Sequence, residues 1–327
     1  MPEGDWLKLV SERLWAALGN SKLTRAELRW PSLGGYNLRG YTVTSSRSYG
    51  KNLLIGLTPP VGQPLKTPLT LHWHLRMDGV VEVAKTGSRQ AGGQNSAIRC
   101  VLANSQWTVL GYRLGMMHLL PTRHEHQLLD HLGPDVLASD FDSQGAAIGV
   151  QRMNLLAYAS SQPYTSNSSR SPGSGQRPEP DIPRQNIPGT NQPGSSHSRP
   201  DTFRTDTSRP LCQVLLDQRV VAGIGTIWMA ETLWALRLWP WTPVTSLSDD
   251  NKLRVLLTAS RLMQRSVVVA RTRGIGGVER HAHGQLGKPC SRCRCPIALN
   301  GTSGPDDPPD QGTGNRVVFW CPGCQAG

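Results

Sequence analysis

Apolar side chains near the start of the chain follow two different periods. Between residues 3 and 19 they recur every three or four positions, which predicts an amphipathic helix with one face on a core. From about residue 26 the pattern changes to short runs that are rich in β-branched residues and bounded by Gly, Pro, Ser or Asn, as strands are. The helical positions are Trp6, Leu9, Val10, Leu14 and Leu18, and the strand-like runs are YTVTSSRSYGKNLLIGL, LTLHWHL, GVVEVA, SAIRCVLA and QWTVLGY.

A helical pattern returns in the second half, where it is interrupted. Residues 161–208 are dominated by Pro, Ser and Gly and hold almost no large apolar side chains, so this segment cannot build a core and is expected to be a disordered linker. The expected helices are LLPTRHEHQLLDHLGPDVLASDFD, GAAIGVQRMNLLAYA, 209–222, 226–238 and 249–270. The predicted organisation is a β-sandwich domain with a flanking helix (1–120), a helical domain (121–160 plus 209–275) split by the linker, and a Cys- and Gly-rich domain (276–327).

The charge of the chain indicates the kind of partner. Lys and Arg number 35 against 23 Asp and Glu, a net charge of +12, which favours a nucleic acid over mere solubility. No apolar run reaches the roughly 18 residues of a membrane span, because the stretch from Val220 to Ala230 is stopped by Glu231. With no signal-peptide pattern at the start, we expect a cytoplasmic, nucleoid-associated monomer that does not bind membranes.

Two CxxC pairs near the C-terminus have the spacing of a metal site. CSRC and CPGC would supply the four thiolates Cys290, Cys293, Cys321 and Cys324 to one tetrahedral zinc ion. Four sulfur ligands leave no open position for water, so the zinc is expected to be structural, and a zinc-dependent hydrolase is disfavoured. Cys295 offers an alternative register with Cys293, although a single residue then separates the two ligands.

Two shorter stretches carry candidate chemistry. In AGIGT, a glycine turn precedes a helix with Thr226 as a candidate N-cap, and the amides around Gly223 and Gly225 are suited to binding a phosphate. In MPEGD, removal of Met1 would leave Pro2 with a free secondary amine, which has a lower pKa than a lysine and is a ready nucleophile. Glu3 beside it is suited to moving protons.

These features, taken in order, resemble the formamidopyrimidine-DNA glycosylase and endonuclease VIII family of base-excision repair enzymes, and the endonuclease VIII-like branch most. MPEG is similar to the family's N-terminus, YGKNLLIGL to its lysine-bearing strand, and HLRMDG to its intercalation loop. HLGPDVLASDF is similar to the entry of its helical domain, LLDQRVVAGIGTIWMAETLW to its helix-two-turn-helix, and GKPCSRC with NRVVFWCPGCQ to its zinc finger.

The resemblance implies roles for individual residues. Pro2 would be the Schiff-base nucleophile, Glu3 the acid that protonates the sugar oxygen, and Lys51 an essential cation at the damaged nucleotide. Arg316, at the tip of the zinc-finger hairpin, would hold a phosphate beside the flipped base. Met77 matches the wedge that fills the gap in the duplex. Further DNA contacts are expected from Tyr112, Arg113 and Leu114 in LGYRLG and from Gly223, Gly225 and Thr226.

The chain departs from the family pattern at several points. Thr226 stands where an Asn that contacts phosphate is usual, which predicts a weaker grip on DNA, and Trp6 replaces a common second glutamate. ARTRGIGGVERHAHGQLGKPC is short and lacks the loop that folds over a flipped 8-oxoguanine. The resemblance therefore implies a bifunctional glycosylase and abasic-site lyase that prefers oxidised pyrimidines and cleaves by β/δ-elimination. The alternative is a non-catalytic homologue that only binds damaged DNA.

Overall fold

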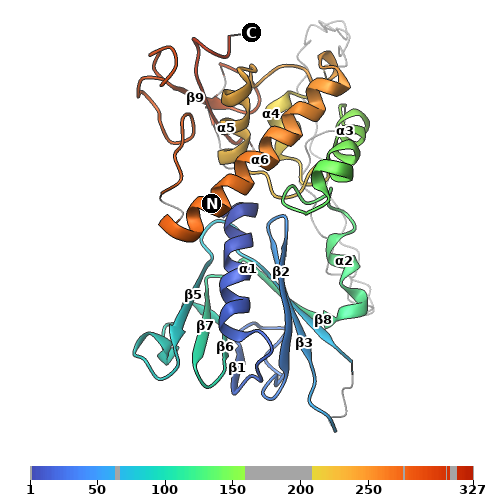
Figure 1. The fold of residues 1–327 in the computed structure, drawn as a ribbon, viewed down its shortest axis with the longest axis vertical. Coiled ribbons are helices and arrows are strands. Elements are labelled where there is room, and N and C mark those ends of the chain that lie inside the picture. The colour runs from blue at the N-terminus through green and yellow to red at the C-terminus, as the bar shows by residue number, and fades with distance from the viewer. Residues whose placement is uncertain are drawn as a thin grey trace, which may run out of the picture.

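The fold is described by a computed structural model that covers residues 2–62, 67–158, 208–274, 277–306, 308–309 and 315–326. Figure 1 shows a β-sandwich below a helical part, with helix α1 (Gly4–Leu18) lying along the sandwich and its N-terminal end reaching the helical part. A small region with two strands lies beside the helical part. The predicted combination of sandwich, helical region and Cys-rich end is confirmed. The predicted linker, 161–208, lies almost wholly outside the described residues.

The sandwich consists of two antiparallel four-stranded sheets. Their orders are β1-β6-β7-β5 and β2-β3-β4-β8. The first predicted run forms the two strands β2 and β3, and each of the other four runs forms one strand. The structure adds two strands, β1 and β8, that the sequence pattern did not indicate. The strands are β1 (Arg25–Leu28), β2 (Thr42–Tyr49), β3 (Asn52–Thr58), β4 (Leu69–His74), β5 (Val80–Lys85), β6 (Ile98–Ala103), β7 (Trp107–Tyr112) and β8 (Met116–Pro121), with a 3-10 turn η1 (Gln90–Gly92).

The sandwich core comes from alternate residues of both sheets. On β3, Leu53, Ile55 and Leu57 are fully buried between the layers, and Cys100 of β6 and Val109 of β7 meet them from the other sheet. This period of two is what faces one side of a strand to the core. Helix α1 adds most of its predicted apolar face to the same cluster, whereas Leu9 packs in a separate cluster with Val267 of the helical part. The packed sandwich therefore supports the turn between β2 and β3, where the site lies.

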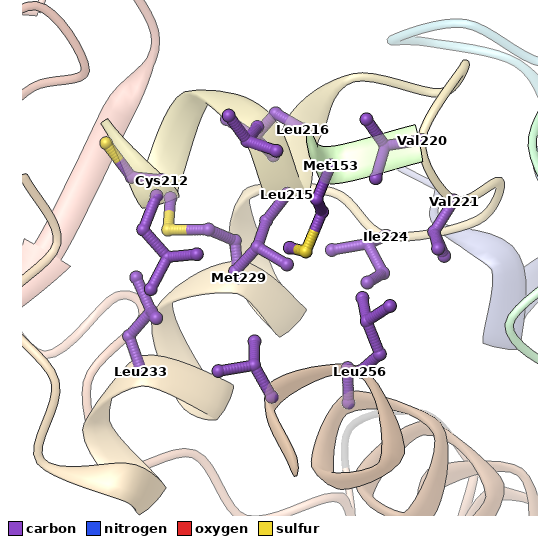
Figure 2. Close-up of a cluster of buried hydrophobic side chains, with 14 of the residues drawn as sticks. Met153, Cys212, Leu215, Leu216, Val220, Val221, Ile224, Met229, Leu233 and Leu256 are labelled. Atoms are coloured by element: carbon purple, nitrogen blue, oxygen red, sulfur yellow. The ribbon is translucent and has the colours of Figure 1, made fainter. Parts of the chain in front are cut away.

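The helical part packs around the N-terminal half of the long helix α6. Met153 of α3, Leu215 of α4 and Met229 of α5 meet Leu256 of α6 in one buried cluster, which Figure 2 shows. Residues of the turn between α4 and α5, including Val221, close the same cluster. The elements are η2 (Thr122–His124), α2 (His126–Leu129), the π-helix η3 (Phe141–Gly145), α3 (Ala146–Leu155), α4 (Leu211–Leu216), α5 (Thr226–Leu236), η4 (Val244–Ser246) and α6 (Asp249–Arg273).

Three local predictions for this part were wrong. Residues 119–142 form the end of β8 and only short helical turns, because Gly133 and Pro134 interrupt the run and the segment pairs with another part of the chain instead. The helix expected over 209–222 ends at Leu216, since the residues after it form the turn into α5. The N-cap of α5 is Gly225, and Thr226 is the first helical residue.

The Cys-rich end pairs β9 (Ala298–Gly301) with β10 (Val317–Trp320) in an antiparallel ribbon. Trp320 and Trp241 rings meet edge to face at 5.3 Å, which joins the ribbon to the segment before α6. Among the helices of the described residues, none combines the length and the apolar character that crossing a membrane requires.

Candidate active site and metal centre

The carboxylate of Glu3 lies at the positive end of helix α5. It accepts hydrogen bonds from the backbone amides of Gly225 (2.9 Å), Ile227 (2.8 Å) and Trp228 (3.3 Å). Glu3 is 1% exposed, and this burial is the largest influence on its pKa and raises it. A carboxylate has about four acceptor sites, so three amide contacts leave room for one proton. Glu3 is therefore held in one position while it keeps the capacity to carry a proton.

The glycine turn before α5 is thus occupied by the chain itself. Besides the amides that bind Glu3, the amide of Gly223 donates to Gln218 Oε1 at 3.0 Å. A side chain at position 225 would overlap the Glu3 carboxyl group, which explains the glycine there. The expectation that the amides of Gly223 and Gly225 are open to a phosphate is corrected, because these amides already donate hydrogen bonds within the chain. The Gly223 amide donates to the Gln218 side chain and the Gly225 amide to the Glu3 carboxylate.

Lys51 is placed beside Glu3 by a tight approach of two backbones. Gly50, with φ of +54°, turns the chain between β2 and β3, and a side chain there would lie 2.7 Å from Cβ of Ala222 and 3.0 Å from N of Gly223. Lys51 follows this turn. Burial lowers the pKa of Lys51 to about 8; the negative charge of Glu3 opposes that shift, and the charge of Arg316 adds to it. These three charged groups therefore share one site.

Helix α1 fixes the start of the chain in the same place. The amide of Gly4 donates to the carbonyl of Gly223 at 3.0 Å, and Ser266 of α6 donates to Asp5 Oδ2 at 2.6 Å. Pro2 is half-buried directly before Glu3. Arg316 is exposed at the start of β10, where its amide bonds to Thr302 Oγ1 at 3.2 Å. The N-terminal Pro2–Glu3 pair, Lys51 and Arg316, which come from three distant parts of the sequence, thus lie around one site.

The predicted intercalation residues lie on two neighbouring loops. Met77 is 59% exposed, and Arg113, which has φ of +43°, donates from Nε to the carbonyl of Asp78 at 3.3 Å. Tyr112 is partly exposed at the end of β7. Leu114 does not fit the role of a DNA contact, because it is 4% exposed and packs into the sandwich core. Its apolar side chain is more stable in the core than in solvent. Of the predicted intercalation residues, Met77 is therefore the exposed apolar group.

The four predicted cysteines form one compact cluster. The sulfur atoms of Cys290, Cys293, Cys321 and Cys324 all lie within 4.8 Å of one another. A tetrahedral ion with bonds of about 2.3 Å to sulfur separates its ligands by roughly 3.8 Å, so the cluster is able to hold one metal ion. Cys295 is not a member, which agrees with the preferred register. Among the described residues this is the one group of three or more potential ligands.

Helix α5 anchors the Cys-rich end through Glu231 and Trp234. The buried carboxylate of Glu231 accepts from the amides of His281, Ala282 and His283, and the Trp234 indole donates to Cys290 Sγ at 3.4 Å. The Trp234 ring lies between the His281 ring and the Arg292 guanidinium. The sequence pattern predicts neither anchor, although an isolated acid in the apolar run TIWMAETLW is typical of a buried acid with partners.

The two histidines of HWH have different surroundings. His72 is buried, with Nε2 2.9 Å from Asn52 Oδ1 and Nδ1 3.2 Å from His118 Nδ1, as a satisfied core histidine would be. His74 lies close to Lys51, and burial together with that charge lowers the pKa of His74 to about 4. His74 is therefore neutral at the site. Neither histidine belongs to the metal-binding group of the described residues.

The sequence of the chain matches one family model and is similar to several known proteins. The model of the formamidopyrimidine-DNA glycosylase H2TH domain matches residues 192–275. The chain is 32% identical over 331 residues to the probable endonuclease 8 2 of Streptomyces coelicolor, which covers 100% of this chain and 95% of that protein. It is 27% identical over 329 residues to the DNA-(apurinic or apyrimidinic site) lyase Nei2 of Mycolicibacterium smegmatis, which covers 99% of both chains.

Solved structures share the fold. The Lactococcus lactis formamidopyrimidine-DNA glycosylase bound non-covalently to DNA with an abasic site has a TM-score of 0.68 and 17% identity, with coverage of 99% of this chain and 100% of that one. The same enzyme with DNA that contains an oxidised pyrimidine has a TM-score of 0.66. At this level of identity the likeness concerns the fold.

Proposed function

The chain belongs to the formamidopyrimidine-DNA glycosylase and endonuclease VIII family, and on that premise we propose that it excises oxidised pyrimidines from DNA and cleaves the strand at the resulting abasic site. The relatives named above are a probable endonuclease 8 and a DNA-(apurinic or apyrimidinic site) lyase, and the solved structures are of a formamidopyrimidine-DNA glycosylase with DNA. The observation that carries the proposal is the position of Glu3, buried at the start of α5 next to Lys51 and directly after Pro2.

The first chemical step would be attack by the N-terminal amine. Once Met1 is removed, the Pro2 nitrogen attacks C1′ of the damaged nucleotide, and the base leaves with the electron pair of its bond to C1′ and takes up the proton that the Pro2 nitrogen loses. Glu3 gives its proton to O4′ as the sugar ring opens. The product is an iminium ion that joins Pro2 to C1′ and withdraws electrons from the neighbouring carbon.

Strand cleavage follows from the same iminium ion. Loss of a proton from C2′ expels the 3′ phosphate by β-elimination, and a second elimination expels the 5′ phosphate. Each step builds negative charge on a phosphate that leaves. The cationic groups Lys51 and Arg316, which share the site with Glu3, are suited to stabilising that charge.

The DNA contacts would surround this centre. Met77, exposed on the loop after β4, would fill the space left by the flipped nucleotide, with Tyr112 and Arg113 on the adjacent loop. Arg316, which is exposed, would hold a phosphate, whereas Thr226 is only 8% exposed and fits that role less well. In the Cys-rich end, zinc is the metal that suits four thiolates and would keep β10 and Arg316 in place.

The preference for pyrimidines rests on the segment between α6 and the cysteine cluster. Three of its amides are bound to Glu231, which ties residues 281–283 to α5. A short segment held this way offers few groups for the edge of a flipped purine. Each lost contact in a buried pocket costs about 1 to 3 kcal/mol, so the larger lesion loses more.

The test is a panel of duplexes that contain dihydrouracil, thymine glycol, 5-hydroxycytosine or 8-oxoguanine opposite the normal partner base. Single-turnover rates should be about tenfold or more faster for the pyrimidines than for 8-oxoguanine. Equal or faster removal of 8-oxoguanine would show that the preference is wrong. Binding without cleavage of any of these substrates, or of an abasic site, would instead support the non-catalytic DNA-binding alternative.

A further inference from the structure

Asp135 is a buried acid in the segment that joins the sandwich to α3. It is 7% exposed and forms a parallel bridge with Ala222 of the glycine turn. The adjacent backbone pairs with the same residue, because Val136 N donates to Ala222 O at 3.0 Å and Ala222 N donates to Pro134 O at 2.9 Å. A carboxylate at this depth is costly unless it has partners. Asp135 therefore lies where the connecting segment meets the turn that holds Glu3.

The partners of Asp135 lead to the Lys51 turn. Asp135 Oδ1 accepts from the amide of Leu137 at 3.1 Å, and the backbone amide of Gly50 favours the ionised form of the carboxylate. Gly50 and Asp135 are close neighbours, because a side chain on Gly223 would lie 3.5 Å from Cα of Gly50 and 3.6 Å from Oδ1 of Asp135. Gly50 directly precedes Lys51 and packs against Ala222 and Gly223. One side chain thus connects the turn that carries Lys51 with the turn whose amides bind Glu3.

Charged and titratable groups face Asp135 from two elements. Burial is the main influence and raises the pKa of Asp135 to about 6, while Lys8 of α1 and Arg47 of β2 favour its ionised form. The Tyr49 phenol of β2 also faces it: burial, first, and the Asp135 charge both raise the pKa of Tyr49, which donates to Gly133 O at 2.9 Å. Arg47 also forms an ion pair with Glu125.

We propose that Asp135 is a positioning residue whose ionised carboxylate holds the Gly50 amide and thereby sets the place of the Lys51 ammonium relative to Glu3. The inference rests on the proposed function, since it gives Asp135 a role only through Lys51. No contact between Asp135 and DNA is required. A backbone amide held by a charged acceptor is fixed more firmly than one held by a neutral group.

The activity is expected to fall at acid pH because of Asp135. When the pH falls through about 6, Asp135 takes up a proton, its acceptor strength drops and the hold on Gly50 weakens. Activity should therefore decline on the acid side in a step that belongs to this carboxyl group. Asp135→Asn keeps one oxygen acceptor but does not titrate, so it should remain active at neutral pH and lack that step.

The experiment measures single-turnover cleavage of an abasic-site duplex, with enzyme in excess, by the full-length wild type and its variants. Asp135→Leu should slow cleavage about tenfold or more, as expected when a buried amide loses its acceptor. Lys51→Gln with Asp135→Leu should be no slower than Lys51→Gln alone, because both changes act on one group. Asp142→Asn, an exposed acid of the same segment, is the control and should behave as the wild type.

The outcomes separate the two proposals. An inactive wild type would contradict the proposed function, whereas an active wild type with a fully active Asp135→Leu variant would overturn the role of Asp135. If the losses of cleavage rate multiply in the double variant, the role of Asp135 would also be overturned, since Asp135 would then act independently of Lys51. If Asp135→Leu does not fold, the pH profile of Asp135→Asn decides, and an acid step identical to that of the wild type would sink the inference.

Discussion

The carboxylate of Glu3 accepts a hydrogen bond of 2.8 Å from the amide of Ile227, a residue 224 positions away in the chain. This bond joins the first residues of the sandwich part to the first turn of α5. The helix end carries a partial positive charge, so the contact favours the ionised form of Glu3, while burial favours the protonated form. The opposition of these two effects is what suits Glu3 to proton transfer.

Covalent chemistry at Pro2 is the first prediction. Borohydride should trap a protein–DNA adduct on an abasic-site duplex when the N-terminal amine is free, because reduction fixes the iminium ion. A version with an N-terminal extension should give no efficient trapping, and proteolytic removal of the extension to expose Pro2 should restore it. Efficient trapping by the extended protein would place the nucleophile elsewhere.

The charge of Lys51 should produce a basic limb in the pH profile. Since burial lowers the pKa of Lys51 to about 8, the ammonium loses its proton as the pH rises through that value, and kcat/KM on an abasic site should fall there. Arg316→Ala removes a positive charge that lowers this pKa, so the limb should move to higher pH. A Lys51→Arg variant stays charged and should lack the limb; an unchanged limb in that variant would assign it to another group.

The cysteine cluster should bind one zinc ion and support Arg316. Cys321→Ser should lose both metal and DNA binding, measured by metal analysis and by fluorescence anisotropy with an abasic-site duplex. Cys295→Ser is the matched control and should keep both. Retention of metal and binding by Cys321→Ser would show that the ligand assignment is wrong.

Arg316 itself should matter for DNA and not for the metal. Arg316→Ala should weaken binding and slow cleavage while zinc stays near one per chain, because the side chain is exposed and Arg316 is not one of the four potential ligands. Arg294→Ala, another exposed arginine of the Cys-rich end, serves as the control. Equal losses in the two variants would indicate a general charge effect instead of a phosphate contact by Arg316.

Removal of the predicted linker should leave catalysis intact. Residues 159–207 lie outside the described residues, but the chain on either side meets, because Arg209 N donates to Ala157 O at 2.8 Å. A short Gly/Ser loop in place of 163–206 can therefore close the same gap at little cost. Cleavage within about twofold of the wild type is expected. A collapse of activity in a folded protein would mean that the segment binds DNA.

Local patterns predicted a large part of the fold. The β-branched-rich run around Gly50 indicated strand structure, which the chain forms as β2 and β3, and the apolar spacing after residue 3 indicated α1. The two strands that the pattern did not indicate, β1 and β8, are short, and their residues depend on partners in β6 and β4. The turn after Leu216 likewise depends on its contacts with residues 133–136.

Local sequence patterns were enough to identify the types of chemical groups in the site: an N-terminal proline with an acid beside it, a lysine after a glycine and four cysteines in two CxxC pairs. Their order and spacing were enough to indicate the family, since these features are local. The packing of the whole chain was needed to show that the Glu3 carboxylate accepts hydrogen bonds from the amides of the α5 turn, that Leu114 packs inside, and that Asp135 lies beside Gly50. Each of these depends on contacts between residues remote in the chain, which no local pattern encodes, and burial at those contacts sets the pKa values of the site.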